Sequence, residues 1–95
     1  MTKGRHRVVI SPAAQRQLRR LPPGEAARLR GPILSLALEP KPPGTTKLAG
    51  TEFWRLRVGD LRIVYVVEDS TIVILKVEGG KYALAGKVEA GGTGN

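Results

Sequence analysis

The 95-residue sequence contains no cysteine and only one histidine, His6. The missing cysteines exclude disulfide frameworks, cysteine-ligated zinc and thiol nucleophiles. A single histidine near the start of the chain makes a Ser-His-Asp triad or a histidine-based metal site a weak hypothesis. We therefore expect neither a metal site nor a cofactor.

Long apolar runs and acidic clusters are also missing from the sequence. No run approaches the length of a membrane span, and the first residues lack the apolar stretch of a signal peptide. Together with the absence of cysteine, this predicts a cytoplasmic protein with no membrane partner. The acidic residues are too scattered for a two-metal nuclease, and no glycine-rich loop precedes the Lys-Ser/Thr of a nucleotide-binding P-loop.

Positive charge is what the sequence has in excess. Sixteen Lys and Arg against eight Asp and Glu give a net charge of +8 and an isoelectric point near 10.7. A small domain this basic typically binds phosphates or an acidic protein. Arginine outnumbers lysine, and its rigid fork binds phosphate oxygens in pairs. The alternative is that the charge serves solubility alone.

The first part of the chain predicts a strand and two helices. A β-branched run over Arg5 to Ile10 predicts the strand. Ser11 as N-cap and Pro12 as first helical residue begin one helix, and Pro22-Pro23-Gly24 is predicted to end it and form the turn. A second helical pattern covers residues 25–38, where Gly31-Pro32 predicts a kink or two separate segments.

The second part predicts a polar Pro/Gly connection and then three strands. The strands are expected at about residues 52–59, 61–68 and 71–77, with Gly59-Asp60 as a two-residue hairpin turn. The order is therefore β-α-α-β-β-β. It predicts an α+β fold in which a helical hairpin packs on a small, mostly antiparallel sheet. We expect one domain over residues 1–78 and a glycine-rich, partly disordered tail over residues 79–95.

The predicted hairpin sorts its residues onto two faces. A two-residue turn pairs Arg57 with Arg62 and puts Trp54, Leu56, Val58, Leu61, Ile63, Tyr65 and Val67 on one apolar face. Arg55, Arg57 and Arg62 then share the other face. Like charges facing each other across strands destabilise a sheet. The missing counter-charge is either a phosphate or acidic partner, or Glu52, Glu68 and Glu78 at a solvated surface.

Three sequence segments resemble the RelE/ParE superfamily of bacterial toxins from toxin–antitoxin modules. They are the Ser-Pro-x-Ala start of the first helix, a Pro/Gly connection ending in Lys-Leu-x-Gly, and Arg-x-Gly-Asp-x-Arg followed by two apolar residues and Tyr across the hairpin. The resemblance runs from about Arg5 to Val77. It implies a RelE-like fold that agrees with the order of elements above.

The resemblance also implies a function. RelE-like members are ribosome-dependent mRNA endonucleases that act without a metal, bind a RelB-like antitoxin, and repress their own operator DNA as a complex. It places Arg55, Arg57 and Arg62 at catalytic and RNA-binding positions, with Arg62 gripping the scissile phosphate. Lys47, in the Lys-Leu-x-Gly segment, joins the implied RNA-binding set.

The sequence departs from the family pattern after Val77. Gly80 and Gly86 stand where members of the family carry an active-site Arg and Tyr, and Lys81 and Tyr82 are the nearby substitutes. Arginine is a poor general base at neutral pH, so either another group accepts the proton or catalysis depends on orientation and charge alone. Two alternatives follow, which are a ParE-like inhibitor of DNA gyrase and a catalytically impaired homologue that only binds antitoxin.

Overall fold

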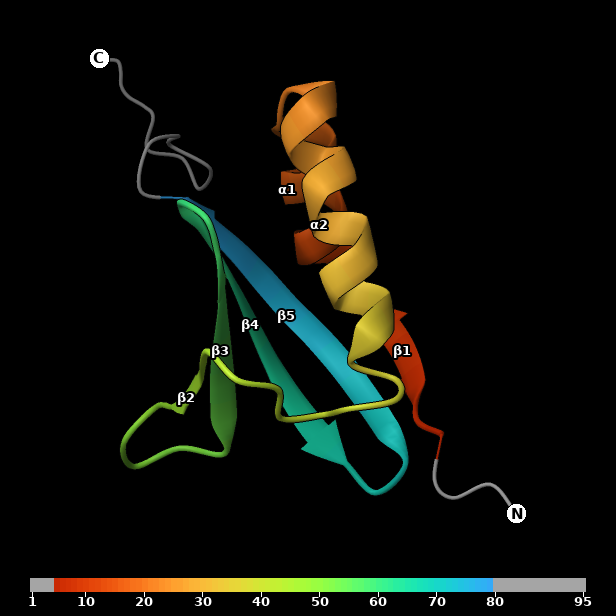
Figure 1. The fold of residues 1–95 in the computed structure, drawn as a ribbon, viewed down its shortest axis with the longest axis vertical. Helices are drawn as coiled ribbons and strands as arrows, with labels where there is room; N and C mark the ends of the chain where they lie inside the picture. Colours follow the sequence, from red (N-terminus) through yellow and green to blue (C-terminus); the bar gives the residue numbers. More distant parts are fainter. Residues whose placement is uncertain (1–4, 80–95) are drawn as a thin grey trace.

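The protein consists of two helices and five strands in a computed structural model that describes residues 5–79 (Figure 1). In chain order the elements are β1 (Arg7–Ile10), α1 (Pro12–Arg20), α2 (Pro23–Ser35), β2 (Thr45–Lys47), β3 (Phe53–Val58), β4 (Leu61–Glu68) and β5 (Thr71–Gly79).

The five strands form one sheet in the order β1-β5-β4-β3-β2. Only the β1–β5 pair is parallel, and the other three pairs are antiparallel. Both helices lie on the same face of the sheet (Figure 1). The predicted α+β fold is confirmed. Neither described helix is long and apolar enough to cross a membrane.

Ser11 links the start of α1 to β5. Its hydroxyl accepts the N–H of Ala14 at 3.1 Å, as an N-cap does, and donates to the carbonyl of Leu75 at 3.0 Å. Further along α1, the side-chain oxygen of Gln17 accepts the backbone N–H of Val77 at 2.7 Å. α1 and its N-cap thus satisfy the backbone polar groups of Leu75 and Val77 in β5, beyond the residues that pair with β1.

Two predictions about α2 need correction. The helix begins at Pro23, so Pro23 and Gly24 belong to its first turn and not to the preceding loop. Of the two alternatives predicted at Gly31-Pro32, a kink or two separate segments, the second is wrong, because α2 continues through Pro32 as one helix. Proline removes one backbone hydrogen bond. Leu29 and Ile33, both buried, pack on either side of that gap and hold the two turns against the sheet.

The connection after α2 contains a short strand that the sequence did not predict. In β2, Thr45 pairs with Leu56 and Lys47 pairs with Trp54. The prolines and glycines around this stretch indicated a loop. Two threonines and the open edge of β3 are sufficient for a three-residue strand, because an unpaired edge offers its N–H and C=O groups to any adjacent extended chain.

The β3–β4 hairpin has the predicted register. Arg57 lies opposite Arg62, and Trp54 lies opposite Tyr65. The turn has a positive φ of 61° at Gly59 and not at Asp60, which is the pattern of a type II′ turn. This confirms that the three arginines share one face.

β5 carries a bulge that the sequence did not indicate. β4 pairs Val64 with Lys76 but Tyr65 with Ile74, so Leu75 is the extra residue. The bulge reverses the alternation within β5, and both Ile74 and Val77 are completely buried. The nearly continuous apolar sequence of residues 71–77 is typical of a strand covered on both faces, but the described helices cover only one.

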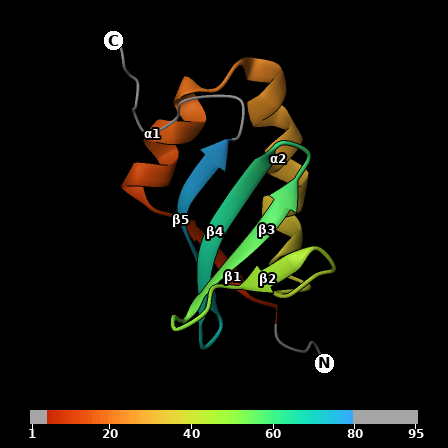
Figure 2. The same ribbon diagram turned by 90° about the vertical axis from the view of Figure 1, so that its left-hand side faces the viewer.

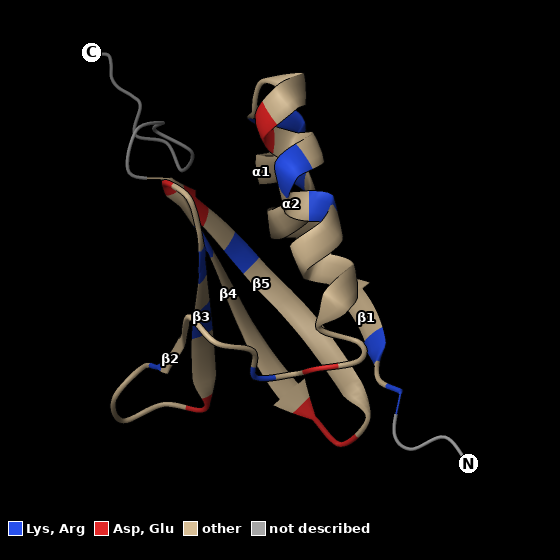
Figure 3. Ribbon diagram, in the orientation of Figure 1, with Lys and Arg blue, Asp and Glu red and all other residues tan. Residues whose placement is uncertain are grey.

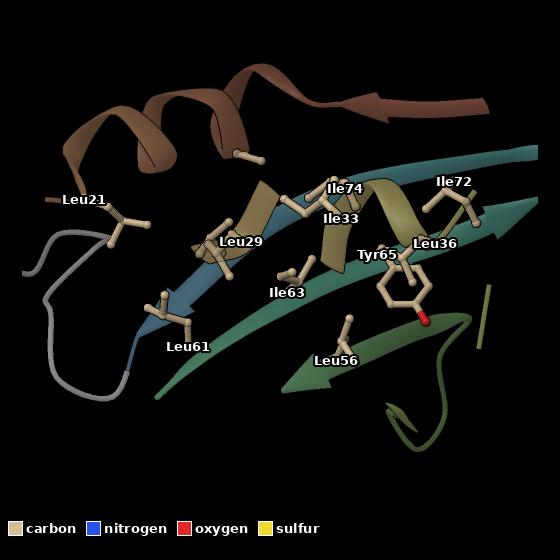
Figure 4. Packing of buried hydrophobic residues seen from close by; sticks show 12 residues of the cluster. Leu21, Leu29, Ile33, Leu36, Leu56, Leu61, Ile63, Tyr65, Ile72 and Ile74 are labelled. Carbon is tan, nitrogen blue, oxygen red and sulfur yellow. The ribbon is translucent and has the colours of Figure 1, made fainter. Parts of the chain in front are cut away.

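The core lies between the helices and the inner face of the sheet (Figure 4). Both helices and their C-caps take part, through Ala14 and Leu21 and through Leu29, Ile33 and Leu36. From the sheet come Leu56, Leu61, Ile63, Tyr65, Ile72, Ile74 and Val77. With the inner face filled, the outer face of the sheet is left for function.

Candidate nucleic-acid interface

The strand register puts Arg55, Arg57 and Arg62 on the outer face of the sheet, opposite to the face of the buried Leu56 and Ile63. Both helices lie on that inner face (Figure 2). The three arginines occupy the end of the β3–β4 hairpin next to the Gly59-Asp60 turn. Strands hold side chains in fixed positions, so three guanidinium groups here can bind a phosphate with little reorganisation. Figure 3 shows Lys and Arg residues in β3 and β5 as well as in α2.

The three arginines differ in their counter-charges. Arg55 lies 3.7 Å from the carboxylate of Glu78, which also contacts the ammonium of Lys76 at 3.2 Å. Arg57 and Arg62 form no ion pair with any acidic side chain within residues 5–79. Of Glu52, Glu68 and Glu78, only Glu78 forms an ion pair with one of these arginines within residues 5–79. The face keeps a net positive charge.

Lys76 is a site residue that the sequence did not reveal, and Glu78 was expected only as one of three possible counter-ions. The bulge at Leu75 turns both side chains to the outer face and sets Glu78 opposite Arg62. Simple alternation from Ile72 and Ile74 would have placed them on the helix side instead. No sequence signal marks the bulge, since Leu75 resembles its apolar neighbours. The arginine site therefore also contains a carboxylate and a lysine.

Arg28 of α2 is a second basic residue that the sequence did not link to the hairpin. Glu25 holds its guanidinium at 2.9 Å, and its terminal nitrogen lies 2.5 Å from where a side-chain carbon on Gly59 would stand. The glycine is thus needed for its positive φ and also leaves room for Arg28. The hairpin turn therefore lies close to the Arg28 side chain of α2.

Lys47 does not join the arginines. It lies on β2 opposite Trp54, on the face that carries the helices. Its ammonium is 5.8 Å from the centre of the Trp54 ring, and that of Lys41 is 4.8 Å from the same ring. Cations attracted to the ring face stabilise this edge of the sheet. A role for Lys47 in RNA binding remains a prediction. It would require the RNA to contact the face that carries the helices as well as the arginine face.

Tyr65 has a structural position. Its hydroxyl donates to the carbonyl of Pro40 at 2.6 Å and anchors the connection between α2 and β2. Burial raises the pKa of Tyr65, and the adjacent Thr45 hydroxyl, which has no well-aligned hydrogen-bond partner, partly opposes that rise. The phenol therefore stays neutral to higher pH than a free tyrosine.

The predicted site residues Lys81 and Tyr82 lie outside the described residues, as do Gly80 and Gly86. Their roles remain predictions, and so does the division into a domain and a tail. The last described residue, Gly79, pairs with Leu61 at the end of the hairpin that carries the arginines. The last described residue therefore lies next to the arginine site.

Comparison with known proteins supplies the family. Residues 8–82 match the family model described as the ParE toxin of the type II toxin–antitoxin system, parDE. No curated protein matches the sequence significantly.

Solved structures resemble the fold closely. The archaeal RelE–RelB complex from Pyrococcus horikoshii OT3 has 31% identity and a TM-score of 0.69, over 82% of this chain and 99% of that one. The RelBE2 toxin–antitoxin complex from Mycobacterium tuberculosis has 26% identity and a TM-score of 0.71, over 78% and 96%. The intact E. coli RelBE complex, at 18% identity, 81% and 99% coverage and a TM-score of 0.67, supports the fold alone.

Proposed function

The chain belongs to the RelE/ParE superfamily of type II toxin–antitoxin toxins, and on that premise we propose that it cleaves mRNA on the ribosome. The observation that carries the proposal is the pair Arg57 and Arg62, directly opposite each other and without an acidic partner within residues 5–79. Two unpaired guanidiniums on adjacent strands are suited to the oxygens of one phosphate.

The chemistry would be an internal transfer within the RNA. The 2′-hydroxyl attacks the adjacent phosphorus, the bond to the 5′ oxygen breaks, and a cyclic phosphate and a free 5′-hydroxyl result. Negative charge builds on the phosphoryl oxygens during the attack. Arg55, Arg57 and Arg62 would stabilise that charge, each fixed donor contributing about 100- to 1000-fold to the rate.

Glu78 is the group we assign to accept the proton of the 2′-hydroxyl. It is the carboxylate nearest the arginines on this face, and its contacts with Arg55 and Lys76 hold it there. Carboxylates are ionised at neutral pH and can act as bases, which arginines cannot. Lys81 and Tyr82 would contribute the remaining charge and protonate the leaving 5′ oxygen.

The partners follow from the same proposal. A RelB-like antitoxin would bind and neutralise the toxin; the similar structures are a RelBE2 toxin–antitoxin complex and a RelE–RelB complex. The toxin–antitoxin complex would bind its operator DNA, and the free toxin would act in the cytoplasm on ribosome and mRNA. The net charge of +8 suits acidic partners of each kind.

A second candidate is a ParE-like inhibitor of DNA gyrase. Two observations favour it, namely the match to the ParE family model and the glycines at positions 80 and 86. Such an inhibitor needs the basic surface but no proton transfer. A homologue that only binds antitoxin is the third possibility.

The deciding experiment compares two reactions of the purified chain. Toeprinting on translating ribosomes should reveal cleavage within the codon in the ribosomal A site, and gyrase supercoiling should continue in the presence of the chain. Gly80→Arg, which restores the charge usual in the family, should increase cleavage. Inhibited supercoiling with intact mRNA would establish the gyrase alternative. If neither effect is observed, antitoxin binding remains as the activity of the chain.

A further inference from the structure

Phe53 is an aromatic side chain on the outer face that neither the core nor the arginine site explains. It begins β3 and pairs with Val66, Val66 pairs with Val73, and Val73 pairs with Val9. Residues paired across neighbouring strands project from the same face. These four side chains therefore form a continuous line across the sheet, which we call the apolar row, and Phe53 is its one aromatic member.

The apolar row is open to solvent at both ends within the described structure. Phe53 is 40% and Val9 41% exposed, and Val66 and Val73 are half-buried. Neither described helix lies on this face (Figure 2). A contiguous exposed apolar patch beside charged groups indicates an interaction site, whereas single exposed apolar residues do not. The apolar row meets this criterion.

The backbone of Phe53 is fixed on both sides. Its N–H donates to the hydroxyl of Thr51 at 3.0 Å, and its carbonyl accepts the N–H of Leu48 at 3.0 Å. The Thr51 hydroxyl in turn donates to the carbonyl of Leu48 at 2.7 Å. These bonds close the turn between β2 and β3. Because the backbone is already ordered, the Phe53 ring loses little further freedom when a planar group stacks on it.

Phe53 and the basic side chains stand in successive rows along the outer face. Arg57 and Arg62 form the row next to the hairpin turn. Arg55 and Lys76 belong to the second row and Phe53 to the third. Successive rows are two residues apart on β3, which is about 7 Å. One nucleotide of an extended RNA strand spans a similar distance. An RNA strand that runs along β3 from the turn would therefore find a cationic pair for each of two successive phosphates and then an aromatic ring.

Glu78 sets the direction in which such a strand runs. It is opposite Arg62 in the first row, but its carboxylate contacts Arg55 at 3.7 Å and Lys76 at 3.2 Å in the second. In the proposed reaction Glu78 accepts the proton of the attacking 2′-hydroxyl, which belongs to the nucleotide on the 5′ side of the cleaved bond. That nucleotide therefore lies on the side of the second row, and the RNA continues in the 5′ direction towards Phe53.

We propose that Phe53 stacks on the base of the second nucleotide on the 5′ side of the cleaved bond, an inference that rests on the proposed function. Arg55 and Lys76 bind the phosphate that joins this nucleotide to the one carrying the attacking hydroxyl. These two cations share the single carboxylate of Glu78, so a positive charge is left for that phosphate. Phe53 stacks on any base, and most strongly on the larger ring system of a purine. Phe53 thus favours a purine at that position.

The first test measures stacking without cleavage. The probes are two short 2′-O-methyl RNAs, one containing only adenine and one only uracil, which cannot be cut because they have no free 2′-hydroxyl. Their affinity for the full-length chain is measured by fluorescence anisotropy. Phe53→Leu removes the ring but keeps an apolar side chain, and Phe53→Tyr keeps the ring. Val9→Ala is the matched control, since Val9 has nearly the same exposure at the other end of the apolar row.

The expected result depends on the ring. Phe53→Leu should weaken binding of the adenine RNA about tenfold and so remove most of its advantage over the uracil RNA. Phe53→Tyr and Val9→Ala should stay close to the wild type, and thermal melting of each variant establishes that it is folded. On translating ribosomes, the wild type should have a lower KM when the second nucleotide on the 5′ side of the cut is a purine, and Phe53→Leu should lose this preference.

Lys76→Gln tests the phosphate contact of the second row. It should weaken binding of both RNAs equally, and it should reduce the slope of log affinity against log salt concentration by about 0.7, as expected when a single strand loses one phosphate contact. Lys41→Gln is the control, because Lys41 lies over the Trp54 ring on the face that carries the helices. It should change neither the affinity nor the slope.

Other outcomes overturn the inference in recognisable ways. If the wild type cleaves mRNA on the ribosome and Phe53→Leu binds and cleaves like the wild type, only this inference fails. If Phe53→Leu and Val9→Ala weaken binding equally, the apolar row acts as a whole and stacking on Phe53 is excluded. A purine preference on the 3′ side of the cut would contradict the assigned direction. If the wild type does not cleave on the ribosome, the proposed function fails, and the position assigned to the stacked base fails with it even if the adenine RNA still binds.

Discussion

The inner and outer faces of the β3–β4 hairpin are built from alternate residues of the same two strands, yet they are suited to different tasks. The inner face contributes Leu56, Leu61 and Ile63, all buried under the helices. The outer face contributes Arg57 and Arg62, opposite each other and repelling. Folding energy therefore comes from one face, and the capacity to bind an anion comes from the other at some cost in stability.

Substitutions one residue apart in this hairpin should therefore have separable effects on stability and on activity. A change on the inner face should lower stability and leave the chemistry of the folded fraction intact. A change on the outer face should lower activity and leave the stability of the fold intact.

The largest effect on stability is expected for Ile63→Ala. Ile63 is completely buried, and truncating a buried isoleucine to alanine costs about 2–5 kcal/mol in the free energy of unfolding. Urea denaturation measures it. Arg62→Ala, at the neighbouring position, is the control and should change stability by no more than about 0.5 kcal/mol. A comparable loss in both variants would mean that the two faces are not separable.

Arg62→Ala should have the largest effect on activity. Removing one fixed donor to the developing charge lowers the rate by about 100- to 1000-fold, measured as ribosome-dependent cleavage by the folded variant. Arg19→Ala removes an exposed arginine from α1, which lies on the other side of the sheet, and should cleave like the wild type. Equal losses in both would assign the effect to total charge and not to the outer face.

Glu78→Gln distinguishes a base from a counter-ion on the outer face. As a general base, Glu78 contributes about 100-fold or more, and its loss should lower kcat by that factor. As a counter-ion only, its removal would release Arg55 and lower KM without lowering kcat. Glu68→Gln is the control, since Glu68 forms no ion pair within residues 5–79.

The hairpin also shows how far the sequence could predict the molecule. The position of Gly59-Asp60 and the strict alternation of apolar and basic residues were enough to predict the register and both faces. The strand β2 was not predictable, because three residues among prolines and glycines form it only by pairing with β3. Glu78 was expected only as one of three possible counter-ions, because its face depends on a bulge that tertiary packing of Ile74 and Val77 selects.

Tyr65 should reveal the inner face through pH. Burial raises the pKa of its phenol, so the unfolded chain loses that proton more readily than the folded one. Stability from this group is full below about pH 10 and falls as the pH rises through the folded pKa. Tyr65→Phe removes the hydrogen bond to Pro40, at a cost of about 1 kcal/mol at neutral pH, and should flatten the alkaline decline. An unchanged decline in the urea titration would mean that another group causes it.

Gly59 is where the two faces meet, and its substitution should have the smallest effect. Its φ of 61° costs an alanine about 1 kcal/mol, while the end of the Arg28 side chain can move away from the added carbon. Gly59→Ala should therefore lower the free energy of unfolding by about 1 kcal/mol in urea denaturation. Gly24→Ala, with open space around it in α2, should raise that free energy by up to about 0.5 kcal/mol.

A slip of one residue would exchange the two faces of the hairpin and is therefore disfavoured. A folded Gly59→Ala variant should thus keep the strand register and most of its cleavage activity. A stable variant without activity would show that Gly59 fixes the register of the arginines as well as the turn.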